Sequence, residues 1–168
     1  SRRGDPHALV FSGECREDNP TPFGVLRRAG MGAMRDVSQR DPEARADIEE
    51  HLHQTGVEHM PILARRSLVV TDMADEAGSL VRENATSHAR FSEATANFFL
   101  HLATAEHPVV LIIDAVQRID EASRDVLEQV ARALRQRHVL LVCTASTGPT
   151  VDGTPEAYLG DTRRISIT

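Results

Sequence analysis

Two runs of apolar residues, each followed by one polar residue, dominate the pattern of the chain. The run Val109–Ile113 ends on Asp114, and the run Val139–Cys143 ends on Thr144. Between them, Asp120 has the side chain of a helix N-cap. It precedes a helical stripe of apolar residues: Val126, Leu127, Val130, Ala131 and Leu134. Continuous apolar strands are typical of a parallel sheet covered on both faces, so this strand–helix–strand order predicts an α/β fold.

Weaker signals predict further elements nearer the start of the chain. Ala8–Phe11 is apolar and indicates a short buried strand that Ser12-Gly13 would close. The polar stretch Glu14–Pro22 contains two prolines and indicates a loop. Phe23–Val37 has helical spacing, although its glycines weaken a helix. We therefore expect strand, loop and helix in this order.

The middle and the end of the chain are less regular. Pro42 is suited to start a helix through Leu52, which Gly56 could end. Ser67–Thr71 fits either a strand or a helical turn. The segment 75–105 is expected to be mainly helical, and Arg164–Thr168 alternates like a final strand. One face of the helical segment is apolar over Phe91, Ala94, Thr95, Phe98, Phe99 and Leu102.

Composition narrows the possible classes of protein. A length of 168 residues suits one domain or part of a larger protein, and 40% hydrophobic residues suffice for a core. The net charge of -6 makes the chain a poor ligand for nucleic-acid phosphates. No apolar run approaches the ~20 residues of a membrane helix, and no signal peptide stands at the start. Cys15 and Cys143 are then expected to be reduced thiols, and the location cytoplasmic.

Asp114 and Thr144 have a special place in the expected sheet. Both follow the carboxyl ends of consecutive strands, where parallel sheets bind their ligands. An aspartate at this position can hold Mg²⁺, which prefers carboxylate and water oxygens. A hydroxyl on the next strand can sense the γ-phosphate of a nucleotide. The alternative is an ordinary α/β sheet whose strands happen to end on polar residues.

Several segments carry a resemblance to a known family. The chain reads VVLIIDA, QRID, EAS and HVLLVCTAS between Val109 and Ser146, with GECREDNPTPFGVLRRAG at Gly13–Gly30 and RRISIT at its end. This pattern resembles the AAA-like module of signal-transducing (STAND) P-loop ATPases in large LuxR-type regulators of actinobacteria and related antibiotic regulators. The resemblance implies a partial three-layer α/β domain of P-loop NTPase type over residues 1–168, with helices on both faces of a parallel sheet.

The chain also departs from that family in two ways. It contains no G-x-x-x-x-G-K-[ST] motif and no lysine, so the P-loop is expected before Ser1 and the helical lid after Thr168. Ala115 replaces the family's second acid, and Arg118 replaces its usual tryptophan. By the resemblance, Asp114 and Thr144 would bind ATP, with Asp114 on Mg²⁺, in the full-length protein. We expect weak or no hydrolysis there and no enzymatic activity in the isolated chain.

The function implied by the resemblance is that of an ATP-dependent switch in a transcriptional regulator. Its partners would be ATP and other domains of the same chain, with DNA bound only through a separate domain and no membrane. Two alternatives stay open: a P-loop-like scaffold without catalytic activity, and the same module regulating a cyclase or a kinase.

Other candidate sites are weaker. His51, His53 and His59 hint at a metal site, but residues two apart on a helix point to different sides. Cys143 lies inside an apolar strand and fits a core residue better than a nucleophile. A Ser/His/Asp hydrolase would need a G-x-S-x-G elbow, which the chain lacks.

Overall fold

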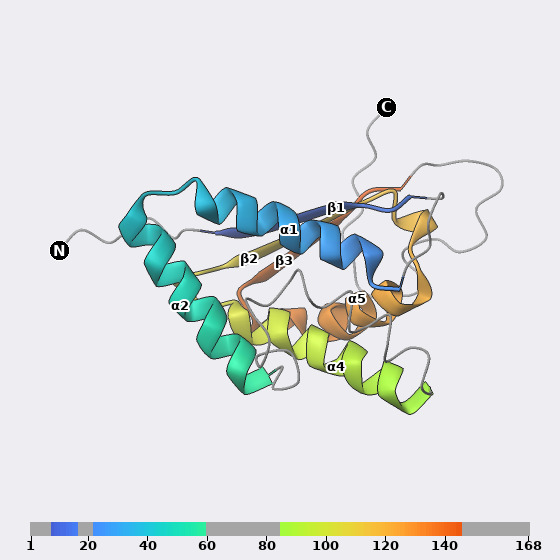
Figure 1. Cartoon of the computed structure of the whole chain (residues 1–168). Coiled ribbons are helices and arrows are strands. Elements are labelled where there is room, and N and C mark those ends of the chain that lie inside the picture. Colours follow the sequence, from blue (N-terminus) through green and yellow to red (C-terminus); the bar gives the residue numbers. More distant parts are fainter. Residues whose placement is uncertain (1–7, 17–21, 60–84, 146–168) are drawn as a thin grey trace.

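The sheet contains three parallel strands in the order β1-β2-β3 (Figure 1). The computed structural model describes residues 8–16, 22–59 and 85–145. The strands are β1 (Leu9–Glu14), β2 (Val109–Asp114) and β3 (Val139–Cys143). Parallel strands in one sheet with helices around it confirm the expected α/β fold class.

The helices follow the sequence pattern closely. They are α1 (Gly24–Ser38), α2 (Pro42–His59), α4 (Ala85–Leu102) and α5 (Glu121–Ala133), with the short 3₁₀ helices η1 (Val116–Arg118) and η2 (Leu134–Gln136). Two expected ends were wrong. Gly56 does not end α2, and Ser12-Gly13 does not close β1, which continues to Glu14. Ser67–Thr71 and Arg164–Thr168 lie outside the described residues.

Gly13 explains why β1 continues through a dipeptide that reads as a turn. A Cβ at Gly13 would lie 2.6 Å from the carbonyl oxygen of Val25 and 3.4 Å from the Cβ of Ala29. Glycine is therefore required for the close approach of α1 to β1, and not for a turn. This contact fixes where the first residues of α1 lie relative to the end of β1.

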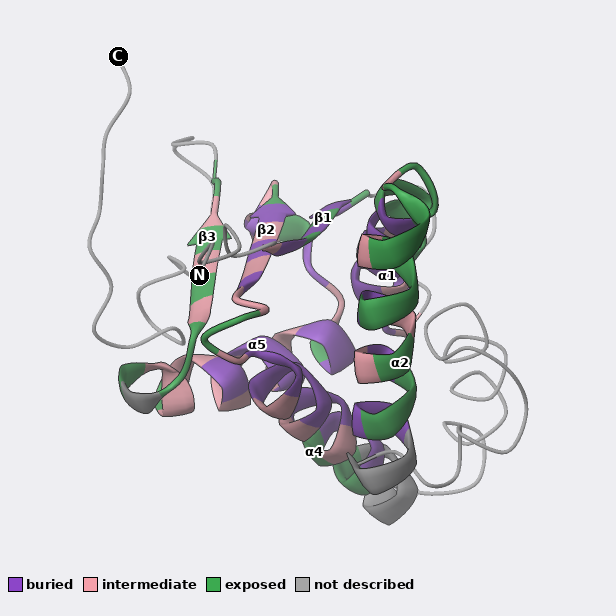
Figure 2. Ribbon diagram, turned by 90° about the vertical axis from the view of Figure 1, so that its left-hand side faces the viewer, coloured by how far each residue is buried: buried purple, intermediate pink, exposed green. Residues whose placement is uncertain are grey.

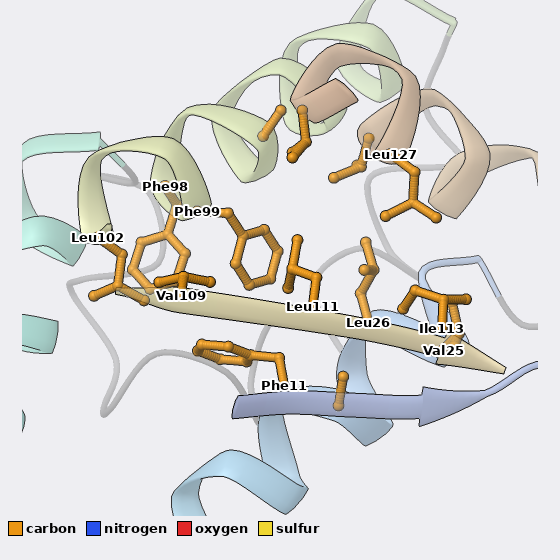
Figure 3. Close-up of a cluster of buried hydrophobic side chains, with 14 of the residues drawn as sticks. Phe11, Val25, Leu26, Phe98, Phe99, Leu102, Val109, Leu111, Ile113 and Leu127 are labelled. Atoms are coloured by element: carbon orange, nitrogen blue, oxygen red, sulfur yellow. The ribbon is translucent and has the colours of Figure 1, made fainter. Parts of the chain in front are cut away.

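The core packs helices α1, α4 and α5 against the sheet, and it also includes Ile48 and Leu52 of α2. Figure 3 shows Leu111 and Phe11 on the side of the sheet that faces Phe99 of α4. The rings of Phe11 and Phe99 meet edge to face with centroids 5.2 Å apart. Leu127 of α5 is also fully buried. Burial of such side chains contributes about 1.5–3 kcal/mol each, so this layer stabilises the sheet that carries the strand ends.

Along each strand, more buried residues alternate with more exposed ones (Figure 2), and the more exposed face of the sheet carries apolar side chains. Val10 is 39% exposed, Leu140 57% and Val142 38%. They share a face because Val10, Val110 and Leu140 are in register. Across the described part of the chain, every helix is too short or too polar to span a bilayer.

Candidate functional site

The carboxyl ends of the three strands form one polar edge. Glu14 ends β1 and is in register with Asp114, which ends β2. Thr144 directly follows β3, whose Cys143 is in register with Ile113. All three polar residues are exposed. The topology therefore gathers polar side chains from distant parts of the chain where parallel sheets place their ligands.

Asp114 and Thr144, the two site residues expected from the sequence, lie together. The Thr144 hydroxyl donates a hydrogen bond to Oδ1 of Asp114. The main chain supports this pair, because the Thr144 amide donates to the Ile113 carbonyl over 3.0 Å. Among the described residues, nothing donates to Oδ2 of Asp114. One carboxylate oxygen is thus held in place, and the other is open at the surface.

The turn after β2 begins at Ala115, which has a left-handed backbone with φ 53°. Its amide donates to Oδ1 of Asp114 over 3.0 Å and to Oγ1 of Thr144 over 3.2 Å. The next amide, of Val116, donates to the Thr144 carbonyl over 2.9 Å. The backbone at 115 therefore orders the Asp114–Thr144 pair, although its methyl side chain has no proton-transfer chemistry.

Asp120 has a second role besides the expected N-cap of α5. Its Oδ1 accepts from the Ser123 amide over 2.9 Å, and its Oδ2 accepts from the Ser123 hydroxyl over 2.7 Å. The same Oδ1 also accepts from the amide of Phe23 over 3.0 Å. Phe23 precedes α1 in a left-handed conformation with φ 58°. Asp120 thus joins the start of α1 to the start of α5 through hydrogen bonds.

Glu14 is a site residue that the sequence analysis missed, because it assigned Glu14 to a loop. The Glu14 carbonyl accepts from both Nε and Nη2 of Arg28, over 3.2 and 2.7 Å. Its carboxylate pairs with Nε of Arg16 over 3.3 Å, and both side chains are more than half exposed. The alternation of buried and exposed residues through LVFSGE is the signal that could have placed Glu14 in the strand.

The pKa values of the two cysteines depend on burial and on the charges near this edge. Burial, followed by the negative charges of Asp120, Asp114 and Glu14, raises the pKa of Cys15 to about 11 against the opposing charge of Arg28. Burial raises the pKa of Cys143 to about 12. Both thiols are free, as expected, and neutral near pH 7. Three carboxylates lie near this thiol, and the positive charges of Arg28 and Arg16 lie at the same edge.

The suspected histidine cluster on α2 has other contacts. His51 lies half-buried and its Nε2 is 2.7 Å from the Leu102 carbonyl, whereas His53 is exposed. The His51 ring stacks on His107, whose Nε2 lies 3.2 Å from Asp47. The side chain of His59 lies outside the described part. Within that part, no three histidine, cysteine or acidic residues are arranged to hold a metal ion.

The donors at the edge fit one half of a magnesium–nucleotide site. Asp114 offers an open carboxylate oxygen and Thr144 a hydroxyl, the hard oxygen donors that Mg²⁺ and its water ligands prefer. The half that cradles phosphates has no counterpart, because the chain has no lysine and no G-x-x-x-x-G-K-[ST] loop. A parallel sheet with these polar strand ends defines the chain as an α/β module of the P-loop NTPase type.

The comparison with protein families gives the particular family. The model described as AAA ATPase domain matches residues 2–142. That span covers most of the 168 residues, so the chain belongs to the AAA ATPase domain family. No curated protein and no solved structure matches the chain. The AAA-like part of the resemblance is thereby confirmed.

Proposed function

We propose that the chain is the central part of an ATP-dependent switch in a signal-transducing regulator. The observation that carries the proposal is the joined pair of Asp114 and Thr144 at the strand ends of an AAA ATPase domain. The second acid that AAA-like modules place after the aspartate is absent at Ala115. Binding with weak hydrolysis suits a switch better than a motor.

In this proposal each residue has a defined task. Asp114 would hold Mg²⁺ and supply the carboxylate charge that this ion prefers, while its Oδ1 stays bonded to Thr144. Thr144 reports the γ-phosphate to β3, because its main chain is bonded on both sides to the β2 segment. The bound Mg-ATP supplies the phosphoanhydride and its charge. The P-loop that cradles the phosphates would come from chain preceding Ser1, and residues 1–168 form one partial domain.

The regulator context rests on the resemblance to LuxR-type proteins of actinobacteria. In that context, a nucleotide-dependent change would be passed to other domains of the same cytoplasmic chain, one of which binds DNA. The net charge of -6 agrees with DNA binding through another domain. The same module could instead regulate a cyclase or kinase, and the domain fused to it in the full-length protein distinguishes these outcomes.

The proposal is tested by titrating the full-length protein with Mg-ATP in a calorimeter. Asp114→Ala should weaken Mg²⁺-dependent binding at least tenfold and leave the fold intact, because the side chain is exposed at a strand end. Asp125→Ala, in α5, is the matched control and should bind like the wild type. Equal affinity of Asp114→Ala and wild type would contradict the proposal.

One observation favours a scaffold without nucleotide as the second candidate: the 168 residues contain neither a lysine nor a P-loop motif. Under either candidate, residues 1–168 alone should bind Mg-ATP weakly or not at all. The full-length protein separates them, since only the switch requires a G-x-x-x-x-G-K-[ST] motif and micromolar Mg-ATP binding. Micromolar binding by residues 1–168 alone would reveal a phosphate site of a different kind.

A further inference from the structure

The contact between α2 and the turn before β2 contains two stacked histidines. His51 lies on α2, and His107 lies in the turn that joins α4 to β2. Their ring centroids are 4.8 Å apart, and the rings are inclined by 29°. Nε2 of His107 also lies 3.2 Å from Oδ2 of Asp47, which is one turn before His51 on the same helix. Titratable side chains thus join two segments that are far apart in the chain.

Burial and hydrogen bonds fix the positions of both rings. The side chain of His107 is 13% exposed, and its amide donates to Oγ1 of Thr104 over 2.9 Å. Nε2 of His51 lies 2.7 Å from the carbonyl oxygen of Leu102, the last residue of α4. Because a carbonyl oxygen can only accept hydrogen bonds, this nitrogen of His51 carries a proton. Both rings therefore have defined partners, and neither can turn away without losing one.

Helix α2 depends on such polar contacts because its apolar face is narrow. Among its described side chains, the large apolar ones that are buried are Ile48 and Leu52. Asp47 and His51 directly precede these two residues in the chain. The polar contact with His107 therefore lies beside the apolar contact, and a change in one affects how firmly the whole helix is held.

The charges around His107 favour a proton on its ring. The acidic side chains on α2 and in the turn are Glu43, Asp47, Glu50 and Glu106. The basic side chains of the neighbouring segments are His101, Arg137 and His138. His101 is bonded within α4, to the Asn97 carbonyl, and both Arg137 and His138 are exposed. Since solvent screens exposed charges, the direct contact with Asp47 dominates.

We infer that His107 and Asp47 form a proton-dependent latch that holds α2 against the turn before β2. Histidine is the side chain whose charge changes between pH 5 and 8. A proton on His107 turns its hydrogen bond to the carboxylate into an ion pair, which is the stronger contact. The stacked His51 favours uptake of one proton and not two, because two charged rings 4.8 Å apart would repel each other. The latch therefore holds more firmly at pH 6 than at pH 8.

Hydrogen exchange of the full-length protein, followed by mass spectrometry, tests the latch by measuring how often α2 opens. The protection of the α2 amides is corrected for the intrinsic pH dependence of exchange. It should rise about threefold from pH 8 to pH 6, because a charged hydrogen bond is stronger than a neutral one while the exposure of Asp47 limits the gain.

Three variants assign the proton. His107→Gln keeps an N–H donor for Asp47 but cannot become charged, so the rise should disappear. Asp47→Asn should also remove it, and this exposed position tolerates the change without loss of the fold. His53→Gln is the control, because His53 is an exposed histidine of the same helix, and the rise should persist. Protection in the wild type that is constant or lower at pH 6 would overturn the latch, as would a rise that persists in both His107→Gln and Asp47→Asn.

Discussion

Single residues in this domain act through backbone geometry as much as through side-chain chemistry. Ala115 and Phe23 both have left-handed backbones, which cost free energy in residues other than glycine. Each donates its amide to an aspartate, Ala115 to Asp114 and Phe23 to Asp120. The two strained residues therefore lie at the bonds that order the strand-end edge.

Restoring an acid at position 115 should raise hydrolysis. Ala115→Glu places a carboxylate next to Asp114, and the left-handed backbone costs glutamate about as much as alanine. Turnover by the full-length protein should rise at least tenfold, within the typical contribution of a positioned base. Ala115→Gln is the control for size and should not show the rise. Steady-state phosphate release decides between them, and equal rates in both variants would contradict the prediction.

Gly13 and Gly32 provide a matched pair for the contact between β1 and α1. Gly13→Ala should destabilise the fold by about 3 kcal/mol, because the new methyl would meet the backbone carbonyl of Val25 at 2.6 Å. Gly32→Ala should stabilise it by about 0.5–1 kcal/mol, since the new methyl would make only an ordinary contact, 3.7 Å from the Ser12 carbonyl oxygen, and alanine favours helices. Urea unfolding measures both, and a small effect at Gly13 would show that α1 can shift at little cost.

At the scale of elements, aspartates cap the starts of two of the helices. The contacts of one are local, and those of the other extend to a distant part of the chain. Asp41 caps α2 by accepting from the Ala44 amide over 3.0 Å, and its contact is local. Asp120 caps α5 and also holds the residue before α1, 97 positions away in the chain. The start of α1 therefore depends on the turn between β2 and α5, which also contains Ala115.

Removing the two caps should show this difference. Asp41→Ala should cost about 1 kcal/mol, the usual loss of an N-cap. Asp120→Ala should cost about 2–4 kcal/mol, because the half-buried Phe23 amide also loses its acceptor. Thermal unfolding of both variants provides the measurement. Equal losses would mean that the bond between α1 and α5 adds nothing to stability.

The elements predicted best from the sequence are those whose bounds depend only on residues close by in the chain. The bounds of β2 and β3 agree because continuous apolar runs ended by Asp114 and Thr144 need no distant information. The N-cap at Asp120 agrees for the same reason. The predicted end of β1 does not agree with the structure, because Ser12-Gly13 is typical of a turn and only the packing of α1 explains the glycine. The place of Glu14 at the strand-end edge was hidden for this reason, and the bond from Phe23 to Asp120 has no local signal in the sequence.

At the scale of the whole molecule, one buried layer and one polar edge have different roles. The layer around Phe11, Phe99 and Leu111 stabilises the sheet, while the edge at Glu14, Asp114 and Thr144 faces solvent. The two cysteines lie where these regions meet. Their raised pKa values mean that the fold keeps both thiols neutral where an unfolded chain would ionise them.

Stability should therefore fall in alkaline solution. Below pH 9 the thiols are neutral in both the folded and unfolded chain, so their contribution to stability is complete. Between pH 9 and about 12 the unfolded chain releases protons that the folded chain retains, and the free energy of unfolding decreases. Cys143→Ala should show a shallower decrease in urea unfolding over this range. An unchanged slope would show that Cys143 is accessible enough to ionise in the fold.

The parallel pairing of β1 with β2 has a consequence for how the chain reaches this fold. Each residue of β1 pairs with the residue 100 positions later, Leu9 with Val109 through to Glu14 with Asp114. The β2–α5–β3 unit, in contrast, closes within Val109–Cys143. Contacts between near residues form faster than those that close long loops, because loop closure costs entropy that grows with length. We therefore expect β1, although it precedes β2 and β3 in the chain, to join them in the sheet last.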